Sequence, residues 1–305
     1  MFSNSDLSPQ HIVTNKKNIL VTGANGQLGM ELQAIAPLHP QYNFLFTTRE
    51  KLPIENIDAV KEFFSKQQLD FCINCAACTA VDKAETEKEN AFLINGTAVG
   101  ELASVCKTNH TQLIHISTDY VFDGEACTPY KETDPTSPLS VYGESKLKGE
   151  HLAFQNDPST IIIRTSWLYS SYGNNFVKTM LRLMKEREII NVVSDQFGSP
   201  TYAADLAEAI MMLIEKCSMS NVQCSILNYA NTGKISWYDF ALAIKELSGS
   251  SCSVNPISTS EYPTAAKRPQ YSVFDTRTIR KILNITIPDW KVSLEKCLSN
   301  LKNGE

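Results

Sequence analysis

The stretch that decides the fold reads Asn18-Ile-Leu-Val-Thr22, followed directly by Gly23-Ala-Asn-Gly26-Gln-Leu-Gly29. The first five residues have the apolar character of a buried strand, and residues 27–36 show helical apolar spacing until Pro37 ends the helix. The glycines between them allow a tight turn and a close approach of the backbone to a ligand. A strand, a glycine turn and a helix in this order predict a dinucleotide site, with phosphate at the helix N-terminus.

The alternation of strand and helix continues along the chain. We expect strands at residues 42–47, 71–75, 112–117 and 160–164, and helices at residues 57–67, 87–109, 203–216 and 237–247. Repeated βα units predict an α/β fold, a Rossmann-type doubly wound parallel sheet, with a smaller C-terminal substrate-binding lobe. The expected division is a flexible leader (1–17), an NAD(P)-binding Rossmann domain (18–165) to which some later segments return, and a mainly substrate-binding lobe (166–305).

Composition excludes several classes of function. A net charge of −5 without a run of Lys or Arg argues against nucleic-acid and membrane partners. No apolar stretch reaches the roughly 18 residues that span a bilayer, and the polar residues 1–17 lack the apolar segment of a signal peptide. The nine cysteines are an odd number scattered through apolar segments, which favours reduced thiols. We therefore expect a cytoplasmic enzyme with a small organic substrate.

A second motif, Tyr142-Gly-Glu-Ser-Lys146, suggests the chemistry. Residues four apart share one face of a helix, so the Tyr142 hydroxyl and the Lys146 ammonium can reach one substrate and one cofactor. An adjacent positive charge favours the phenolate, and the same ammonium can bind the nicotinamide ribose. The pattern predicts Tyr142 as proton donor to a carbonyl, with Thr118, at the end of the fourth strand, polarising it. The alternative is a tyrosine packed at a helix start beside a surface lysine.

The end of the second strand bears on cofactor choice. An acidic residue there would bind the ribose of NAD, but the strand ends at Thr47-Thr-Arg49. Arg49 facing a 2′-phosphate favours NADPH, with NADH as the alternative. The small residues Ala76 and Ala77 follow the third strand, where a dinucleotide crosses the sheet edge.

Six further segments are characteristic of one family. They are Ala76-Ala-Cys-Thr-Ala-Val-Asp-Lys-Ala-Glu85, Ser117-Thr-Asp-Tyr-Val-Phe122, Arg164-Thr-Ser-Trp-Leu-Tyr169, Asn174-Asn-Phe176, Asp195-Gln-Phe-Gly-Ser-Pro-Thr201 and Arg268-Pro269. With them the chain resembles the extended short-chain dehydrogenases/reductases and, among these, the dTDP-4-dehydrorhamnose reductases, from Asn18 nearly to its end. The resemblance implies reduction of the C4 ketone of dTDP-4-dehydro-β-L-rhamnose to dTDP-L-rhamnose, the last step of dTDP-rhamnose synthesis, with hydride from NAD(P)H.

The resemblance also implies a set of site residues. The cofactor would contact Gly23, Gly26, Gln27, Leu28, Gly29, Arg49, Ala76, Ala77, Cys78, Thr79, Tyr142 and Lys146; the dTDP-sugar would contact Thr118, Asp119, Trp167, Asn175 and Arg268. A guanidinium fork suits diphosphate oxygens, so we choose Arg268 over Lys267. The alternative for Trp167 is packing in the core. Asp195 and Gln196 either contact the ligand or cap a loop, and we leave them out of the set.

Some positions depart from the family pattern. Cys78 stands where relatives often carry histidine, and Pro53-Ile54 replaces an acidic turn. Glu31 matches one ligand of a metal that bridges subunits in some relatives, but Ala204 replaces a second, so we predict no metal site and no Mg²⁺ dependence. For the oligomeric state, a homodimer is the alternative to a monomer.

Two rival functions remain. One is a non-catalytic regulatory subunit resembling the β subunit of methionine adenosyltransferase, and the other is a different sugar-nucleotide reductase or epimerase. The segments around Trp167 and Asp195 favour the reductase.

Overall fold

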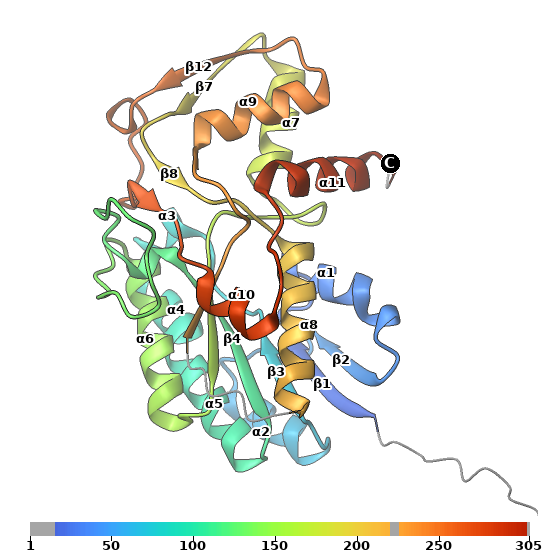
Figure 1. The fold of residues 1–305 in the computed structure, drawn as a ribbon. Helices are drawn as coiled ribbons and strands as arrows, with labels where there is room; N and C mark the ends of the chain where they lie inside the picture. Colours follow the sequence, from blue (N-terminus) through green and yellow to red (C-terminus); the bar gives the residue numbers. More distant parts are fainter. Residues whose placement is uncertain (1–15, 220–225, 304–305) are drawn as a thin grey trace, which may run out of the picture.

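The computed structural model describes residues 16–219 and 226–303. Most of the expected leader, residues 1–15, lies outside them. The large lobe is built on six strands, all paired in parallel, in the order β10-β5-β4-β3-β1-β2 (Figure 1). Their bounds are β1 Lys17–Thr22, β2 Tyr42–Thr47, β3 Phe71–Asn74, β4 Gln112–Thr118, β5 Ile161–Thr165 and β10 Ile226–Tyr229. This sheet confirms the predicted Rossmann-type fold.

Helices cover both faces of this sheet, which explains why its strands are apolar throughout. Along β1, Ile19 and Val21 point to one side and Leu20 to the other, because side chains alternate across a strand. The first face packs on α1 (Gln27–Ile35), α8 (Ala203–Met219) and α10 (Arg277–Leu283), and the second on α2 (Ile57–Ser65) and α5 (Ala98–Thr108), with α6 (Val141–Asn156) beside α5.

The strand order changes direction between β1 and β3. The chain runs from β1 outward to β2, then crosses back to β3 on the other side of β1 and continues to β4 and β5. Ligands of open α/β sheets bind at such a switch point, beyond the carboxyl ends of the strands. The glycine turn follows β1 directly and therefore lies at this point.

The small lobe lies above the carboxyl edge of the sheet (Figure 1). It contains α7 (Phe176–Glu186), α9 (Trp237–Ser248), α11 (Trp290–Asn303) and the parallel pair β7 (Ile189–Val193) and β12 (Ser253–Ile257). Shorter strands complete it: β6 (Leu168–Tyr169) with β9 (Thr201–Tyr202), and β8 (Phe197–Gly198) with β11 (Ile235–Ser236) and β13 (Tyr271–Ser272). Between these segments the chain returns to the large lobe as α8, β10 and α10. No helix in residues 16–219 or 226–303 is long and apolar enough to cross a membrane.

One element differs from the sequence prediction. The single helix expected at residues 87–109 is interrupted: α4 (Lys88–Phe92) passes into a π-helical segment, η2 (Leu93–Thr97), before α5. The wider turn brings Asn95 into the interior, where it is fully buried. Five residues of π-helix are too few to alter an apolar periodicity of 3.6, which is why the sequence did not reveal them. The remaining short elements are η1 (Ala36–Leu38), α3 (Val81–Ala84), η3 (Asp119–Val121) and η4 (Thr259–Glu261).

Candidate active site

The glycine turn brings two backbone segments into contact. Gly23 has φ +63°, and a Cβ at this residue would lie 2.6 Å from the backbone nitrogen of Ala76. A Cβ at Gly29 would meet the backbone of Ala24 at the same distance. Only glycine permits both approaches. The N-terminus of α1 and the loop after β3 thereby form one concave backbone surface.

A pocket of about 320 Å³ opens beside this turn. Its lining includes Gly23, Asn25, Gly26, Arg49, Glu50, Leu52, Ile54, Glu55, Cys75, Ala76, Ala77, Cys78, Asn90 and Ile94. Six of the twelve cofactor residues predicted from sequence thus line one pocket: Gly23, Gly26, Arg49, Ala76, Ala77 and Cys78. Leu28 packs in the core, so only its backbone can face this site. Thr79 is exposed.

Arg49 stands at the pocket rim with a protein partner of its own. Its Nε and Nη2 lie 3.0 and 2.8 Å from Glu55 Oε1, while 65% of the arginine side chain remains exposed. Sequence reasoning did not single out Glu55. A carboxylate beside Arg49 reduces the positive charge available to a 2′-phosphate.

The loop after β3 is held by two buried asparagines. Asn95 accepts a hydrogen bond from the Cys78 amide at 2.8 Å and donates to the Cys78 carbonyl at 3.0 Å. Its amide also donates to Ser145 on α6. Asn74 accepts from the Ala76 amide at 3.2 Å. Sequence reasoning missed Asn95, because an asparagine inside a predicted helix gives no sign of the element that it will contact.

A buried polar chain connects the first strand to Lys146. Thr22 donates to Asn74 at 2.7 Å, the Asn74 amide lies 3.1 Å from His115 Nδ1, and His115 Nε2 lies 3.3 Å from Lys146 Nζ. Lys146 Nζ also donates to the Ile116 carbonyl at 2.6 Å. Burial lowers the pKa of Lys146 to about 8, while Glu150 and Cys75 oppose the shift. Burial, with Lys146, keeps His115 neutral by lowering its pKa.

Tyr142 and Lys146 lie one turn apart near the start of α6, both buried. Burial raises the pKa of Tyr142, and a hydrogen bond with the Thr118 hydroxyl opposes that shift. Lys146 does not lower the tyrosine pKa here, which corrects the sequence prediction: its ammonium is turned toward Ile116 and His115. Tyr142 is consequently protonated at neutral pH, which is the form a proton donor requires.

Asp119 is a buried carboxylate with an unused acceptor. Thr118 Oγ1 donates to its Oδ1 at 3.0 Å, whereas Oδ2 is buried without a partner among the described residues. Burial raises the pKa of Asp119 to about 6, and the Ser272 and Thr118 hydroxyls near it oppose that shift. A buried acceptor without a donor, beside Tyr142, suits a ligand hydroxyl.

Trp167 is held by stacking from the small lobe. Its ring lies 3.5 Å from that of Trp237, centroid to centroid, at an interplanar angle of 9°. A Cβ at Gly198 would lie 2.5 Å from the Trp167 ring. Part of the indole thus packs within the lobe, and it is only half-buried. Trp237 was expected only as the start of a helix.

Asn175 joins the two lobes. Its Oδ1 accepts from the Lys178 amide and caps α7, while its Nδ2 donates to Gln27 Oε1 at 2.9 Å and to the Ser170 carbonyl at 2.7 Å. Both polar atoms of Asn175 therefore have protein partners, and its amide orients Gln27 at the glycine turn.

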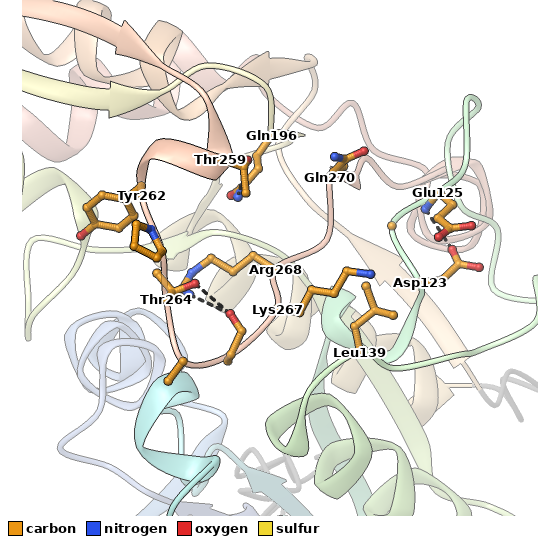
Figure 2. A pocket seen from close by; sticks show the side chains of 14 residues that line it. Asp123, Glu125, Leu139, Gln196, Thr259, Tyr262, Thr264, Lys267, Arg268 and Gln270 are labelled. Atoms are coloured by element: carbon orange, nitrogen blue, oxygen red, sulfur yellow. Dashed lines mark hydrogen bonds between the residues drawn. The ribbon is translucent and has the colours of Figure 1, made fainter.

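Arg268 borders two cavities at the junction of the lobes. One, of about 450 Å³, is bounded by Asp123, Gly124, Glu125 and Leu139 of the large lobe and by Gln196, Thr259, residues 262–268 and Gln270 (Figure 2). The other, of about 650 Å³, is lined by Phe176 and Trp237 among other residues. Figure 2 shows the Arg268 side chain running toward Thr264, away from that of Lys267, which runs toward Leu139.

The wall of the first cavity includes the turn at Thr259. Asp195 accepts hydrogen bonds from the Thr259 amide at 2.9 Å and from its hydroxyl at 2.6 Å. Gln196 donates to the same hydroxyl at 3.1 Å. Both residues cap the loop, one of the two readings that the sequence left open.

Glu31, which matches a metal ligand of some relatives, has a partner within the protein. Glu31 is buried and accepts from Ser170 at 2.5 Å, and burial raises its pKa. Within the described ranges no three His, Cys, Asp or Glu side chains converge as metal ligands. Cys72 and Cys75 are free thiols, and burial raises the pKa of Cys75, which makes it a poor nucleophile.

Comparison with known proteins identifies relatives along the whole fold. The family model described as RmlD substrate binding domain matches residues 17–303. The chain is 41% identical to the dTDP-4-dehydrorhamnose reductase of Aggregatibacter actinomycetemcomitans, covering 91% of this chain and 97% of that protein. It is 40% identical to the enzyme of the same name from Escherichia coli K12, covering 93% and 98%.

A solved structure from the same family is similar to this chain over nearly its whole length. The dTDP-4-dehydrorhamnose reductase of Bacillus anthracis, in complex with NADP, superimposes with a TM-score of 0.88 at 40% identity, over 93% of this chain and 99% of that one.

Proposed function

The chain belongs to the family of the dTDP-4-dehydrorhamnose reductases, and on this premise we propose which of its side chains bind the two substrates and move the proton. The enzyme reduces the C4 ketone of dTDP-4-dehydro-β-L-rhamnose to dTDP-L-rhamnose with NADPH. The observation that carries our assignment is the buried cluster of Tyr142, Thr118 and Lys146, beside the glycine turn at the switch point of the sheet.

The nucleotide fits the surface at the glycine turn. NADPH supplies the hydride to C4 when it is bound. Because Gly23 lacks a Cβ, the turn packs directly on the loop at Ala76, and the surface that the two segments form would hold the pyrophosphate against the N-terminus of α1. Gly26, Gln27, Gly29 and the backbone of Leu28 would complete that contact, Ala77, Cys78 and Thr79 the nicotinamide side, and Arg49 the 2′-phosphate.

Tyr142 delivers the proton to the C4 oxygen. Its raised pKa keeps the hydroxyl protonated until charge develops on that oxygen, because an alkoxide is a stronger base than a phenolate. The Thr118 hydroxyl, which donates to Asp119 Oδ1 in the structure, would turn its hydrogen to the carbonyl oxygen and share this charge. Lys146 then stabilises the phenolate and binds the nicotinamide ribose, which requires its ammonium to turn from Ile116.

The sugar nucleotide would bind between the lobes. Asp119 Oδ2 would accept from a sugar hydroxyl, and the half-buried Trp167 would contact the sugar ring. Arg268 would bind the diphosphate as a guanidinium fork. Asn175 would contribute to the diphosphate side indirectly, because it orients Gln27 by a hydrogen bond.

The test is a reductase assay on the purified protein. Loss of reduced-nicotinamide absorbance should depend on dTDP-4-dehydro-β-L-rhamnose and should yield dTDP-L-rhamnose. A protein that binds NADPH but never oxidises it, with this or any 4-keto sugar nucleotide, would support the regulatory-subunit alternative instead.

Location and assembly remain predictions. Eight cysteines in the described ranges are free thiols, which supports the cytoplasm, where thiols stay reduced. Light scattering of the purified enzyme, with and without Mg²⁺ and a chelator, would decide whether it is a monomer or a homodimer and whether a metal contributes.

A further inference from the structure

A short segment after the cofactor loop contacts both halves of the active site. Helix α3 is followed by Glu85, and its Ala84 is buried in a cluster with Val141 and Tyr142 at the start of α6. The segment therefore packs directly against the catalytic tyrosine. Two of its acidic side chains, Asp82 and Glu85, each hold a different part of the site.

Asp82 holds the substrate-side loop of the small lobe. Its Oδ2 lies 2.7 Å from Arg268 Nη2 and its Oδ1 3.1 Å from Nη1, which is a bidentate pair. The same Oδ1 accepts from the Ala266 amide at 3.1 Å. The Arg268 guanidinium lowers the pKa of Asp82, so the carboxylate is charged at neutral pH.

These contacts leave one side of the guanidinium unused. Nη1 donates to Asp82 and, at 3.1 Å, to the Ala266 carbonyl, while Nη2 gives one hydrogen to Asp82. Arginine has five N–H groups, so the Nε hydrogen and the second Nη2 hydrogen remain. No acceptor for either is found among residues 16–219 and 226–303. Nε and Nη2 form a parallel pair of donors, which matches two oxygens of a diphosphate.

Glu85 holds the start of the catalytic helix. Its Oε1 accepts from the Val141 backbone amide at 2.9 Å, one of the N-terminal amides of α6 that lack a partner within the helix. Ser140 caps another of these amides, that of Gly143, at 3.2 Å. A carboxylate at this end also interacts favourably with the helix dipole. The position of Tyr142 is thus fixed from the α3 segment.

We propose that Asp82 and Glu85 are positioning residues of the reductase: Asp82 orients Arg268 so that its free Nε and Nη2 hydrogens meet the substrate diphosphate, and Glu85 fixes the helix that carries Tyr142. The inference rests on the proposed function. It assigns the two residues separable effects, Asp82 on binding of the sugar nucleotide and Glu85 on the chemical step.

The Asp82 arm of the test measures the KM for the sugar nucleotide and the Kd for dTDP. Asp82→Ala should raise both about tenfold, the value of one charge-assisted hydrogen bond, with kcat and the Kd for NADPH nearly unchanged. Asp82→Glu should recover part of the loss. In an Arg268→Ala background, Asp82→Ala should add nothing. Unchanged or tighter dTDP binding by Asp82→Ala would overturn the proposal, because Asp82 would then be a bystander or a competitor of the diphosphate.

The Glu85 arm measures kcat and the isotope effect with deuterated NADPH. Glu85→Ala should lower kcat about fivefold and raise the isotope effect, leaving the Kd for dTDP unchanged, whereas Glu85→Gln should retain most activity. Lys83→Ala, which breaks only the exposed pair of Lys83 with Glu87 on the same segment, is the matched control. A fall in kcat equal to that of the control would refute this role.

Absence of reductase activity in the wild-type protein would refute the proposed function itself. The Asp82 and Glu85 variants test only the positioning roles, because each is compared with an active wild-type enzyme.

Discussion

The cofactor turn and the substrate side of the active site are held by different kinds of contact. At the turn, backbone meets backbone: Gly23 lies directly against the Ala76 amide, which leaves no space for a Cβ. On the substrate side, side chains from distant segments pair, and Arg268 meets Asp82 across 186 positions of sequence. The turn therefore depends on the absence of atoms, and the substrate side on charge and hydrogen bonding. Substitutions at the two should fail in different ways.

The largest effect is expected where side-chain chemistry alone is removed. Tyr142→Phe deletes one hydroxyl from a buried ring, so the fold and NADPH binding should persist while kcat falls about 10³-fold. Steady-state kinetics and NADPH fluorescence titration measure the two quantities. The control is Tyr120→Phe, which deletes the same group from a neighbouring ring that packs edge-on against Tyr142. Activity of Tyr142→Phe within tenfold of wild type would assign the proton to another group.

Backbone contact should fail differently. Gly23→Ala combines a left-handed backbone with a contact of 2.6 Å, so we expect a loss of about 3 kcal/mol in the free energy of unfolding and a large loss of NADPH affinity. Chemical denaturation and cofactor titration report these effects. Gly249→Ala is a matched control with φ +71° but open space around its Cβ, and should cost about 1 kcal/mol. Equal losses in both variants would mean that strain, and not close approach, governs the turn.

This contrast also explains how far the sequence could be interpreted. The turn, β2 and the start of α1 were predicted closely, because glycine spacing and strand alternation are local signals. Thr118, Tyr142 and Lys146 were proposed from motifs; in the structure Tyr142 lies beside Thr118, and Lys146 lies one turn further along α6.

What the sequence could not supply were partners. Glu55 beside Arg49, Asn95 beneath Cys78 and Trp237 against Trp167 are contacts between elements, and no local pattern encodes them. The pKa of Tyr142 was misjudged for the same reason: adjacency on a helix gives the spacing of Lys146, but not the burial or the carbonyl toward which its ammonium turns.

The charged groups of the site predict a bell-shaped pH profile. Because burial lowers the pKa of Lys146 to about 8, its ammonium is lost as pH rises through that value, and kcat/KM should fall. Because burial raises the pKa of Asp119 to about 6, its carboxylate is lost as pH falls through that value, and kcat/KM should fall there also. Profiles of kcat/KM report the free enzyme, and each limb should change about tenfold per pH unit. Asp119→Asn should lower the activity and abolish the acidic limb; if that limb persists unchanged, another group causes it.

The smallest effect is expected at the rim of the cofactor pocket. The Nε and Nη2 groups of Arg49 donate to the Glu55 carboxylate, but the arginine is largely exposed. Such exposed pairs contribute at most about 1 kcal/mol to stability. Glu55→Gln removes a negative charge from the neighbourhood of the 2′-phosphate and weakens the hold on Arg49. The ratio of kcat/KM for NADPH to that for NADH should therefore rise about threefold, chiefly through the KM for NADPH. Glu62→Gln, which breaks the exposed pair of Glu62 with Lys66 on α2, is the control for a change of net charge. A fall in this ratio, or an equal change in both variants, would mean that Arg49 does not bind the 2′-phosphate. The side-chain contacts of this pocket would then not determine the preference for NADPH over NADH.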